Sequence, residues 1–323
     1  MDDKMDANKS HEALEKVHHL SFIREEYIKE YTVDKKFKAL ERARRLRTFL
    51  PLPVTRLPGI LYISKSDLRE LPQQLPFLRV LSLAFHKIDF IPESIGSLKH
   101  LRYLNFSKTN IILLPEEIGN LHNLQILLLS GCRYLYRLPD SIYKLTNLRH
   151  LDIVNTNDLY KMPSGICGLT SLQTLSRVII GKESECRVSD LKSLVHLRGQ
   201  LSIEGLQRVK DVVHVKEANL HQKKGIYDLQ MKWSAIFDDS RNGTTEYEVL
   251  EGLRPFKKLG RLEIKFYGGT KFPSWVGDPT FDCLKELILY GCRSCTCLPT
   301  LGQLRSLQTL TVTSMCSLKR LGF

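Results

Sequence analysis

The 323-residue chain lacks any apolar run of the length that a membrane-spanning helix needs, so the sequence predicts no membrane span. Its first 16 residues, MDDKMDANKSHEALEK, are polar and carry acids, and we expect neither a secretion signal nor a transit peptide there. Eight cysteines without a secretion signal are expected to be reduced thiols. The sequence therefore favours the cytosol or the nucleus.

Acidic residues are the scarcer charge, with 35 Asp and Glu against 48 Lys and Arg, and the net charge is +13. Such a charge suits an anionic partner but says nothing about the fold. The motifs of common enzyme classes are missing, since the chain has no GxSxG, HExxH or GxGxxG and no four-residue Cys/His zinc array. We expect no enzymatic activity, no bound metal and no cofactor.

What the chain has is an internal repeat of 23 or 24 residues. Full units begin at Leu78, Leu101, Leu124, Leu148 and Leu284, and a partial unit begins at Leu307. Each unit has the pattern LxxLxLxx, then an apolar residue and proline, then xxIGxLxxL. The alternating leucines are typical of a strand with one buried face, and the proline prevents further pairing and turns the chain.

One such unit cannot bury its leucines alone, whereas stacked units share a continuous core. The sequence therefore predicts an α/β fold, namely a leucine-rich-repeat solenoid or horseshoe. Its concave face carries a parallel β-sheet, and its convex side carries short helical, 3-10 or irregular segments. We expect a flanking segment over 1–70, regular repeats over 71–180, irregular repeats with insertions over 181–256, and C-terminal repeats over 257–323.

Several elements are expected outside the regular repeats. Strands are predicted within 17–27 and 46–58, and helices over 34–46, 64–75 and 212–225. A turn at Asn242-Gly243 precedes another predicted helix, in which Thr245 and Glu248 match a capping box. The chain stops in mid-unit at Phe323 without a polar cap, so we expect the last unit to exchange amide hydrogen fastest and the units from Leu101 to Leu169 slowest.

The stretch GCRSCTCLP, residues 291–299, resembles a thiolate clip for a soft metal. Alignment with GCRYLYRLP, residues 131–139, favours another interpretation. Cys292 matches Cys132, Cys295 matches a core leucine, and Cys297 matches an exposed arginine. We therefore expect the three thiols to diverge, with Cys295 as a small buried apolar residue.

The residues that alternate with the strand leucines are expected on the concave face, where solenoids bind partners. Lys232, Arg261 and Lys265 predict a mixed but basic patch there. For any single residue, the alternative is a solvated strand position without a binding role. The candidate partner-binding residues are Tyr103, Asn105, Ser107, His150, Asp152, Asp228, Gln230, Lys232, Arg261, Glu263, Lys265, Glu286, Tyr290 and Thr311.

A basic run over 35–47 has three possible roles. It could bind nucleic acid or act as a nuclear signal, but it has few interleaved aromatic residues and a credible apolar face. We expect a solvated helix face and no nucleic-acid partner. The third role, docking against a neighbouring module, is implied by the family resemblance described next.

Five stretches resemble one protein family: HLSFIREEY, LRTFLPL, the repeats over 78–132, VLEGLRPF, and GGTKFPSWVGD at 268–278. They are similar to the leucine-rich-repeat region of plant coiled-coil, nucleotide-binding immune receptors, over residues 17–323. The resemblance implies recognition of a pathogen effector or an effector-modified host protein on the concave face, and autoinhibition by docking on a nucleotide-binding module.

The chain departs from this family in having no P-loop, no His-Asp switch motif, no coiled coil and no winged-helix region. Nucleotide binding therefore does not carry over, and we expect a fragment or a truncated product. The alternative function is a general intracellular scaffold that assembles signalling proteins on similar repeats. The insertions over 190–283 favour the receptor hypothesis.

Overall fold

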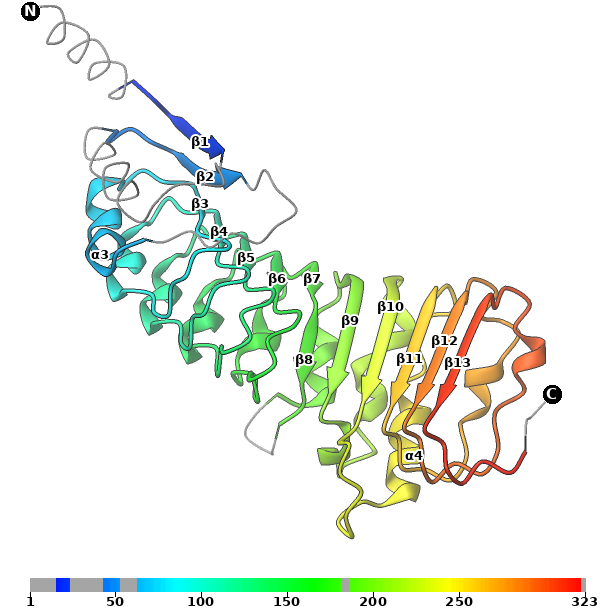
Figure 1. Ribbon diagram of the computed structural model, residues 1–323. Coiled ribbons are helices and arrows are strands. Elements are labelled where there is room, and N and C mark those ends of the chain that lie inside the picture. Colours follow the sequence, from blue (N-terminus) through cyan, green and yellow to red (C-terminus); the bar gives the residue numbers. More distant parts are fainter. Residues whose placement is uncertain (1–15, 24–42, 53–62, 182–185, 321–323) are drawn as a thin grey trace, which may run out of the picture. The chain divides into compact units, whose positions relative to one another are not determined.

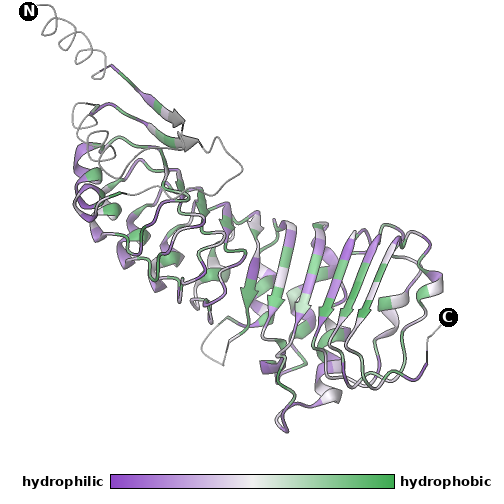
Figure 2. Ribbon diagram, viewed as in Figure 1, coloured by the Kyte–Doolittle hydropathy of each residue, from purple (hydrophilic) through white to green (hydrophobic). Residues whose placement is uncertain are grey.

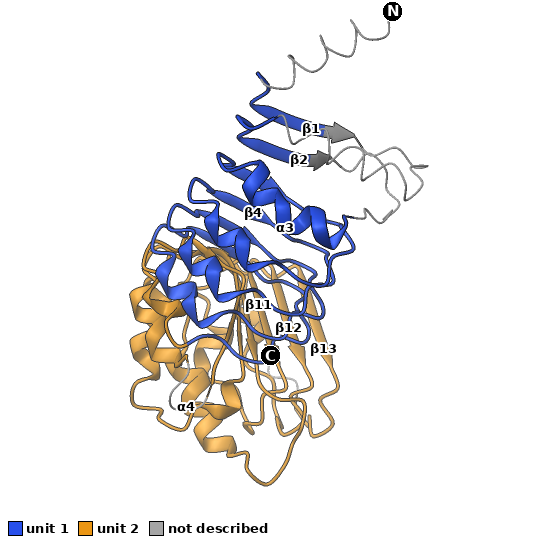
Figure 3. Ribbon diagram, turned by 90° about the vertical axis from the view of Figure 1, so that its left-hand side faces the viewer, with its two compact units in different colours: residues 1–163 blue, residues 164–323 orange. Residues whose placement is uncertain are grey.

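The computed structural model describes residues 16–23, 43–52, 63–181 and 186–320. These residues belong to two compact units, Met1–Pro163 and Ser164–Phe323 (Figure 3). Within the described ranges, no helix has the length and apolarity needed to cross a bilayer. The predicted helix over 34–46 and most of the basic run over 35–47 lie outside these ranges.

The first unit contains strands that follow one another in chain order, each parallel to the next (Figure 1). The repeat leucines stack in register, because Leu81, Leu104, Leu127 and Leu151 are successive partners and all are fully buried. This confirms the predicted leucine-rich-repeat core. The strands are β1 (His19–Ile23), β2 (Thr48–Leu52), β3 (Val80–Ser82), β4 (Tyr103–Asn105), β5 (Ile126–Leu128) and β6 (His150–Asp152).

The segments that return from each strand are short 3-10 helices, η2 (Glu93–Ser97), η3 (Glu116–Asn120) and η4 (Asp140–Lys144). Each begins directly after the repeat's proline, whose carbonyl accepts the first turn's hydrogen bond, as from Ile118 N to Pro115 O at 3.2 Å. Proline suits this position because it needs no backbone donor and its φ is already helical. The predicted short return is confirmed.

The glycine of the IG pair permits close stacking of neighbouring returns. A Cβ added to Gly119 would lie 2.6 Å from Ser141 Cβ and 2.7 Å from Ser141 O. We therefore expect Gly119→Ala to lower the free energy of unfolding by about 1–3 kcal/mol through overpacking. The matched control is Gly168→Ala, since a Cβ there meets no atom within 4 Å. Hydrogen exchange in the strands of each unit measures both changes, and equal effects would contradict close stacking at the glycine.

The N-terminal predictions are also confirmed where the structure describes them. Strands β1 and β2 form in the two predicted segments, and α3 (Lys65–Gln74) forms within 64–75. Ser64 caps this helix by accepting from Asp67 N, and Leu68, Leu71 and Leu75 are buried as their spacing predicts. Pro72 lies inside the helix and is buried, so apolar packing outweighs the lost backbone donor.

The second unit is again built of parallel strands, and β8 to β13 are neighbours in chain order (Figure 1). Apolar and polar residues alternate along these strands (Figure 2). The strands are β7 (Thr174–Leu175), β8 (Arg177–Ile179), β9 (Arg198–Glu204), β10 (Gly225–Lys232), β11 (Arg261–Lys265), β12 (Glu286–Tyr290) and β13 (Thr309–Thr313).

The connections in this unit are mostly 3-10 turns, and one is an α-helix. They are η5 (Ile166–Gly168), η6 (Val188–Ser193), η7 (Leu206–Arg208), η8 (Val215–Ala218), η9 (Leu220–Gln222), α4 (Gly243–Gly252), η10 (Ser274–Gly277) and η11 (Leu301–Gln303). The core is made by two stacked columns of strand residues, Leu201–Leu229–Leu262–Leu287 and Ile203–Met231–Ile264–Leu289, all buried.

Two predictions about the insertions were wrong. The helix predicted over 212–225 is replaced by the two 3-10 turns η8 and η9, because Asn219 between them adopts a left-handed conformation with φ of 51°. The helix near 242 forms as α4, but its cap is Asn242 rather than a Thr245–Glu248 box. Asn242 Oδ1 accepts hydrogen bonds from Thr244 N at 2.9 Å and Thr245 N at 3.1 Å.

Candidate functional site

In the first unit, the candidate residues are half-buried side chains at the ends of short strands. Asn105 Nδ2 donates to the Tyr103 hydroxyl at 3.2 Å, and its Oδ1 accepts from Ser107 N at 2.9 Å. In the same way, Asp152 Oδ1 accepts a hydrogen bond from Val154 N at 3.0 Å. These contacts stabilise the turn after the strand, so Asn105 and Asp152 have a structural role whether or not they bind a partner.

The sheet register aligns the candidates of the first unit in two rows. Tyr103 and His150 flank Ile126 in one row, and Asn105 and Asp152 flank Leu128 in the other. Ile126 and Leu128 were not among the predicted residues, although both hold the same alternating position. An apolar pair therefore separates the polar candidates of β4 from those of β6.

In the second unit, Arg261 is the centre of a network of ion pairs across three strands. The register makes Asp228, Arg261 and Glu286 direct neighbours on β10, β11 and β12. The guanidinium of Arg261 contacts Asp228 Oδ1 at 3.1 Å, Glu263 Oε2 at 3.1 Å and Glu286 Oε2 at 3.0 Å. Because the planar guanidinium has donors in several directions, one side chain holds three carboxylates.

A second centre of the network is Glu204 on β9. Its carboxylate binds Arg177 of β8 in bidentate fashion, with N–O distances of 2.8 and 2.9 Å, and Lys232 Nζ lies 3.3 Å away. Neither Arg177 nor Glu204 was among the predicted residues. Arg177 lies on β8, which lacks the leucine pattern of the repeats. On β9, Gln200, Ser202 and Glu204 alternate with buried residues, and this alternation could have identified Glu204 as a candidate.

Glu263 connects the uncharged residues Gln230 and Ser202 to the network. Burial raises the pKa of its carboxyl, but hydrogen bonds from Lys265 at 2.7 Å and Gln230 at 2.8 Å outweigh that effect and hold the pKa below its usual value. Gln230 Oε1 in turn accepts from Ser202 Oγ at 2.7 Å. We call the ion-paired group the charge network, comprising Arg177, Glu204, Asp228, Lys232, Arg261, Glu263, Lys265 and Glu286.

The charge network corrects the prediction of a basic patch. Lys232, Arg261 and Lys265 each have a carboxylate partner, so the region presents alternating rather than excess positive charge. The two remaining candidates lie farther along the sheet. Tyr290 is part-exposed with its ring edge on Phe266, and Thr311 is an exposed residue of β13.

The three cysteines of GCRSCTCLP follow the repeat register. Cys292 and Cys295 are fully buried, whereas Cys297 is part-exposed. Cys295 Sγ donates to Gly269 O at 3.0 Å, as expected for a small core residue. Burial raises the pKa of the Cys292 thiol to about 12 and also raises the pKa of the Cys295 thiol, so both stay protonated at neutral pH. The prediction that Cys295 points into the core is confirmed.

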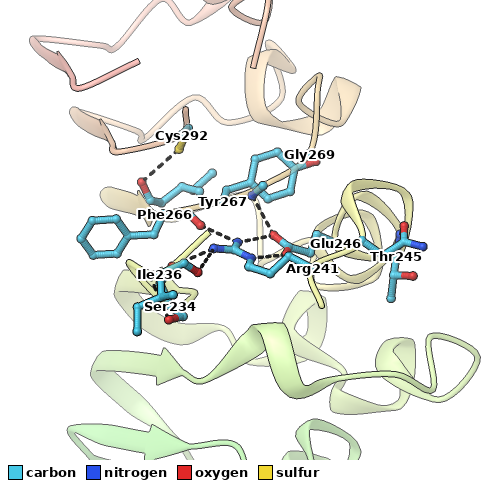
Figure 4. Close-up of polar contacts among 12 residues, drawn as sticks. Ser234, Ile236, Arg241, Thr245, Glu246, Phe266, Tyr267, Gly269 and Cys292 are labelled. Atoms are coloured by element: carbon cyan, nitrogen blue, oxygen red, sulfur yellow. Dashed lines mark hydrogen bonds and ion pairs between the residues drawn. The ribbon is translucent and has the colours of Figure 1, made fainter. Parts of the chain in front are cut away.

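A buried ion pair between Arg241 and Glu246 links α4 to the insertion that precedes it, residues 234–242 (Figure 4). Arg241 and Glu246 are only 7% and 5% exposed and form two N–O contacts of 2.7 Å. Arg241 also donates to the carbonyls of Ser234 and Phe266, both at 2.7 Å, while Gly268 N donates to Glu246. These contacts join the insertion, the helix and the segment after β11, and none of these residues belongs to the charge network.

Comparison with known proteins places these repeats in a family. Residues 188–315 match the R13L1/DRL21 leucine-rich repeats, and residues 100–121 match the general leucine-rich repeat. The chain is 38% identical to RPP13-like protein 1 of Arabidopsis thaliana, over 95% of this chain and 29% of that protein. It is 36% identical to disease resistance protein RGA2 of Solanum bulbocastanum, over 43% of this chain and 14% of that protein.

The chain spans less than a third of the length of these relatives, both of which carry disease resistance in their names. Solved structures show the same fold at low identity. An internalin from Listeria monocytogenes covers 97% of this chain and 88% of its own with a TM-score of 0.54 and 18% identity. The plant peptide hormone receptor RGFR1 covers 92% of this chain and 55% of its own with a TM-score of 0.53 and 18% identity.

The stacked parallel strands, the register of the repeat leucines and the similarity over nearly the whole chain agree with one another. The chain has the leucine-rich-repeat fold, and over most of its length it is similar to plant disease resistance proteins.

Proposed function

We propose that the chain is a non-enzymatic protein-recognition module of an intracellular plant immune receptor. It binds a pathogen effector, or a host protein modified by an effector, on the strand faces that carry the candidate residues. It also contributes to autoinhibition by contacting a nucleotide-binding module of the same receptor class. The similarity to named disease resistance proteins over 95% of the chain supports the receptor class.

The observation that carries the recognition role is the charge network. Its members lie on neighbouring strands and are held by one another, and Arg261, Glu286 and Lys232 remain partly exposed. Binding orders flexible side chains at a free-energy cost, and a surface whose charges are already held avoids part of that cost. Charges of both signs in fixed positions favour a complementary partner and reject others.

The general scaffold is the second candidate. The match to R13L1/DRL21 repeats covers residues 188–315 and therefore includes the whole range of insertions, 190–283, that distinguishes the two hypotheses. It favours the receptor. A scaffold of signalling proteins would have no reason to bind secreted proteins of a plant pathogen.

The test is a split-luciferase screen of the full chain in leaf cells against a library of pathogen effectors and host proteins, with the nucleotide-binding region of a plant immune receptor as a second bait. We expect at least one effector, or one host protein associated with an effector, to bind the chain. We expect the nucleotide-binding region to bind the chain when that partner is absent. Binding only to host kinases and phosphatases, with no effector and no nucleotide-binding region, would favour the scaffold and overturn the proposal.

A further inference from the structure

Exposed apolar side chains recur at one position of the first unit's repeats. Ile112, Tyr136 and Tyr160 are each the third residue before the repeat's proline, and they are 52%, 50% and 45% exposed. Leu113 follows Ile112 directly, Tyr134 lies two residues before Tyr136, and both are exposed as well. We call these five residues the tyrosine stripe. They lie in the segments between the strands and the 3-10 returns, away from the strand residues of the candidate site.

Three residues of the stripe contact one another across neighbouring repeats. Tyr136 N donates to Ile112 O at 3.0 Å, which fixes one repeat against the next. The rings of Tyr136 and Tyr160 lie 4.6 Å apart between centroids. Aromatic side chains held in this way offer a large contact area with little conformational entropy left to lose on binding.

The core does not require these side chains. In each of these repeats the preceding residue, Ile111, Leu135 or Leu159, is buried and fills the apolar position of the unit. In the repeat before them, the stripe position is held by Asp89, which pairs with Lys65 at 3.3 Å. The position is therefore a surface position, and three large apolar residues there expose a patch of the kind that marks protein interfaces.

Cations surround the stripe. Arg133 and Arg137 are exposed and Lys161 is part-exposed, and among the described residues none of the three has an ion-pair partner within 4.0 Å. This differs from the charge network, in which every cation is paired. Two exposed acids offset part of this charge, namely Asp158 and Glu116, which interacts electrostatically with Arg137, so the rim keeps one excess positive charge.

We propose that the tyrosine stripe binds an acidic segment of a protein partner. Apolar or aromatic side chains of that segment contact Ile112, Tyr136 and Tyr160, and its carboxylates pair with the cations of the rim. Tyrosine and arginine are the residue types that most often dominate binding energy at interfaces. The tyrosine stripe shares no residue with the charge network, so this proposal can be correct even if the proposed function is wrong.

Two other occupants fit less well. A second copy of this chain would bring a net charge of +13 against a positive rim. A nucleic acid would find tyrosine rings to stack on, but Ile112 and Leu113 have no flat faces and Asp158 repels phosphate. Both remain measurable outcomes of the same experiment.

The test is selection of a random 12-residue phage-displayed peptide library on the full chain, followed by fluorescence anisotropy with the selected peptides. We expect selected peptides to combine Asp or Glu with Trp, Phe or Leu. Their affinity should fall about tenfold or more in Tyr136→Ser/Tyr160→Ser and in Arg137→Ser/Lys161→Ser. The matched control is Tyr143→Ser, because Tyr143 is 53% exposed but lies on η4, outside the stripe. This control should bind like the wild type.

Four outcomes would overturn the proposal. The first three are that no peptide is enriched, that the selected peptides lack acidic residues, and that all variants bind the peptides with equal affinity. The fourth is that a 20-residue oligouridine competes with the peptides for the wild type and that the tyrosine and the cation variants no longer bind this oligouridine. A dimer in sedimentation that Tyr136→Ser/Tyr160→Ser dissociates would assign the stripe to self-association instead. If the tyrosine variant fails to fold by circular dichroism, the Arg137→Ser/Lys161→Ser variant decides, since both side chains reach into solvent.

Discussion

Replacing Arg241 with methionine is expected to lower the free energy of unfolding of the second unit by about 3–5 kcal/mol. The substitution leaves the Glu246 carboxylate buried without its cation and leaves the carbonyls of Ser234 and Phe266 without their donor. A buried charge that loses its partner retains the full cost of leaving water. Urea unfolding, combined with hydrogen exchange in β10 and β11, measures the change.

The matched control is Arg254→Met. Arg254 pairs with Asp278 at the same distance of 2.7 Å, but its side chain is half exposed, so solvent screens the pair. We expect a loss below about 1 kcal/mol there. The double variant Arg241→Met/Glu246→Leu removes both charges and should recover part of the loss. Equal effects of Arg241→Met and Arg254→Met would show that burial does not set the strength of these pairs.

The second large effect concerns Lys223, whose side chain is only 3% exposed and whose ammonium donates to Leu191 O and Leu194 O at 2.8 Å each. Burial lowers its pKa from 10.5 to about 8 in the folded chain. Between pH 8 and 10.5 the unfolded chain therefore holds a proton that the folded chain has released. Stability contributed by this group rises with pH across that window, by up to about 3 kcal/mol, and is constant below it.

Urea unfolding of the wild type and of Lys223→Met across this pH range isolates the effect. Other groups titrate in both proteins, so the difference between the two unfolding free energies reports Lys223 alone. We expect that difference to move in favour of the wild type as pH rises from 8 to 10.5. Lys224→Met is the matched control, since Lys224 is the exposed neighbour and should show no such movement. Parallel curves for the wild type and Lys223→Met would contradict a buried, readily deprotonated amine.

Much of the fold could be predicted because the repeat encodes it locally. The leucines of LxxLxL alternate like any half-buried strand, and alignment of the units alone places Leu104 and Leu127 at the same position of the repeat. The proline after each strand marks the return, because proline cannot continue the pairing. Prediction failed at η8 and η9, where apolar periodicity suggested a helix but the left-handed Asn219 divides the segment.

The candidate site was less predictable. Alternation identifies the side of the strand on which Asp228 and Arg261 lie. It does not show that the two residues are neighbours, because they are 33 residues apart in the sequence and an insertion lies between them. Only the register shows that Arg261 lies between two acids. Residue types along single strands therefore predicted excess positive charge, whereas the cross-strand neighbours make the face balanced.

Recognition by the charge network is tested most directly by calorimetric titration of an effector or host protein from the leaf-cell screen into the wild type, Arg261→Ala and Arg254→Ala. Arg261 holds three carboxylates of the charge network, whereas Arg254 belongs to an ion pair outside it. We predict that Arg261→Ala weakens binding about tenfold or more, and that Arg254→Ala binds like the wild type. Equal affinities of all three proteins would contradict the claim that the charge network recognises the partner.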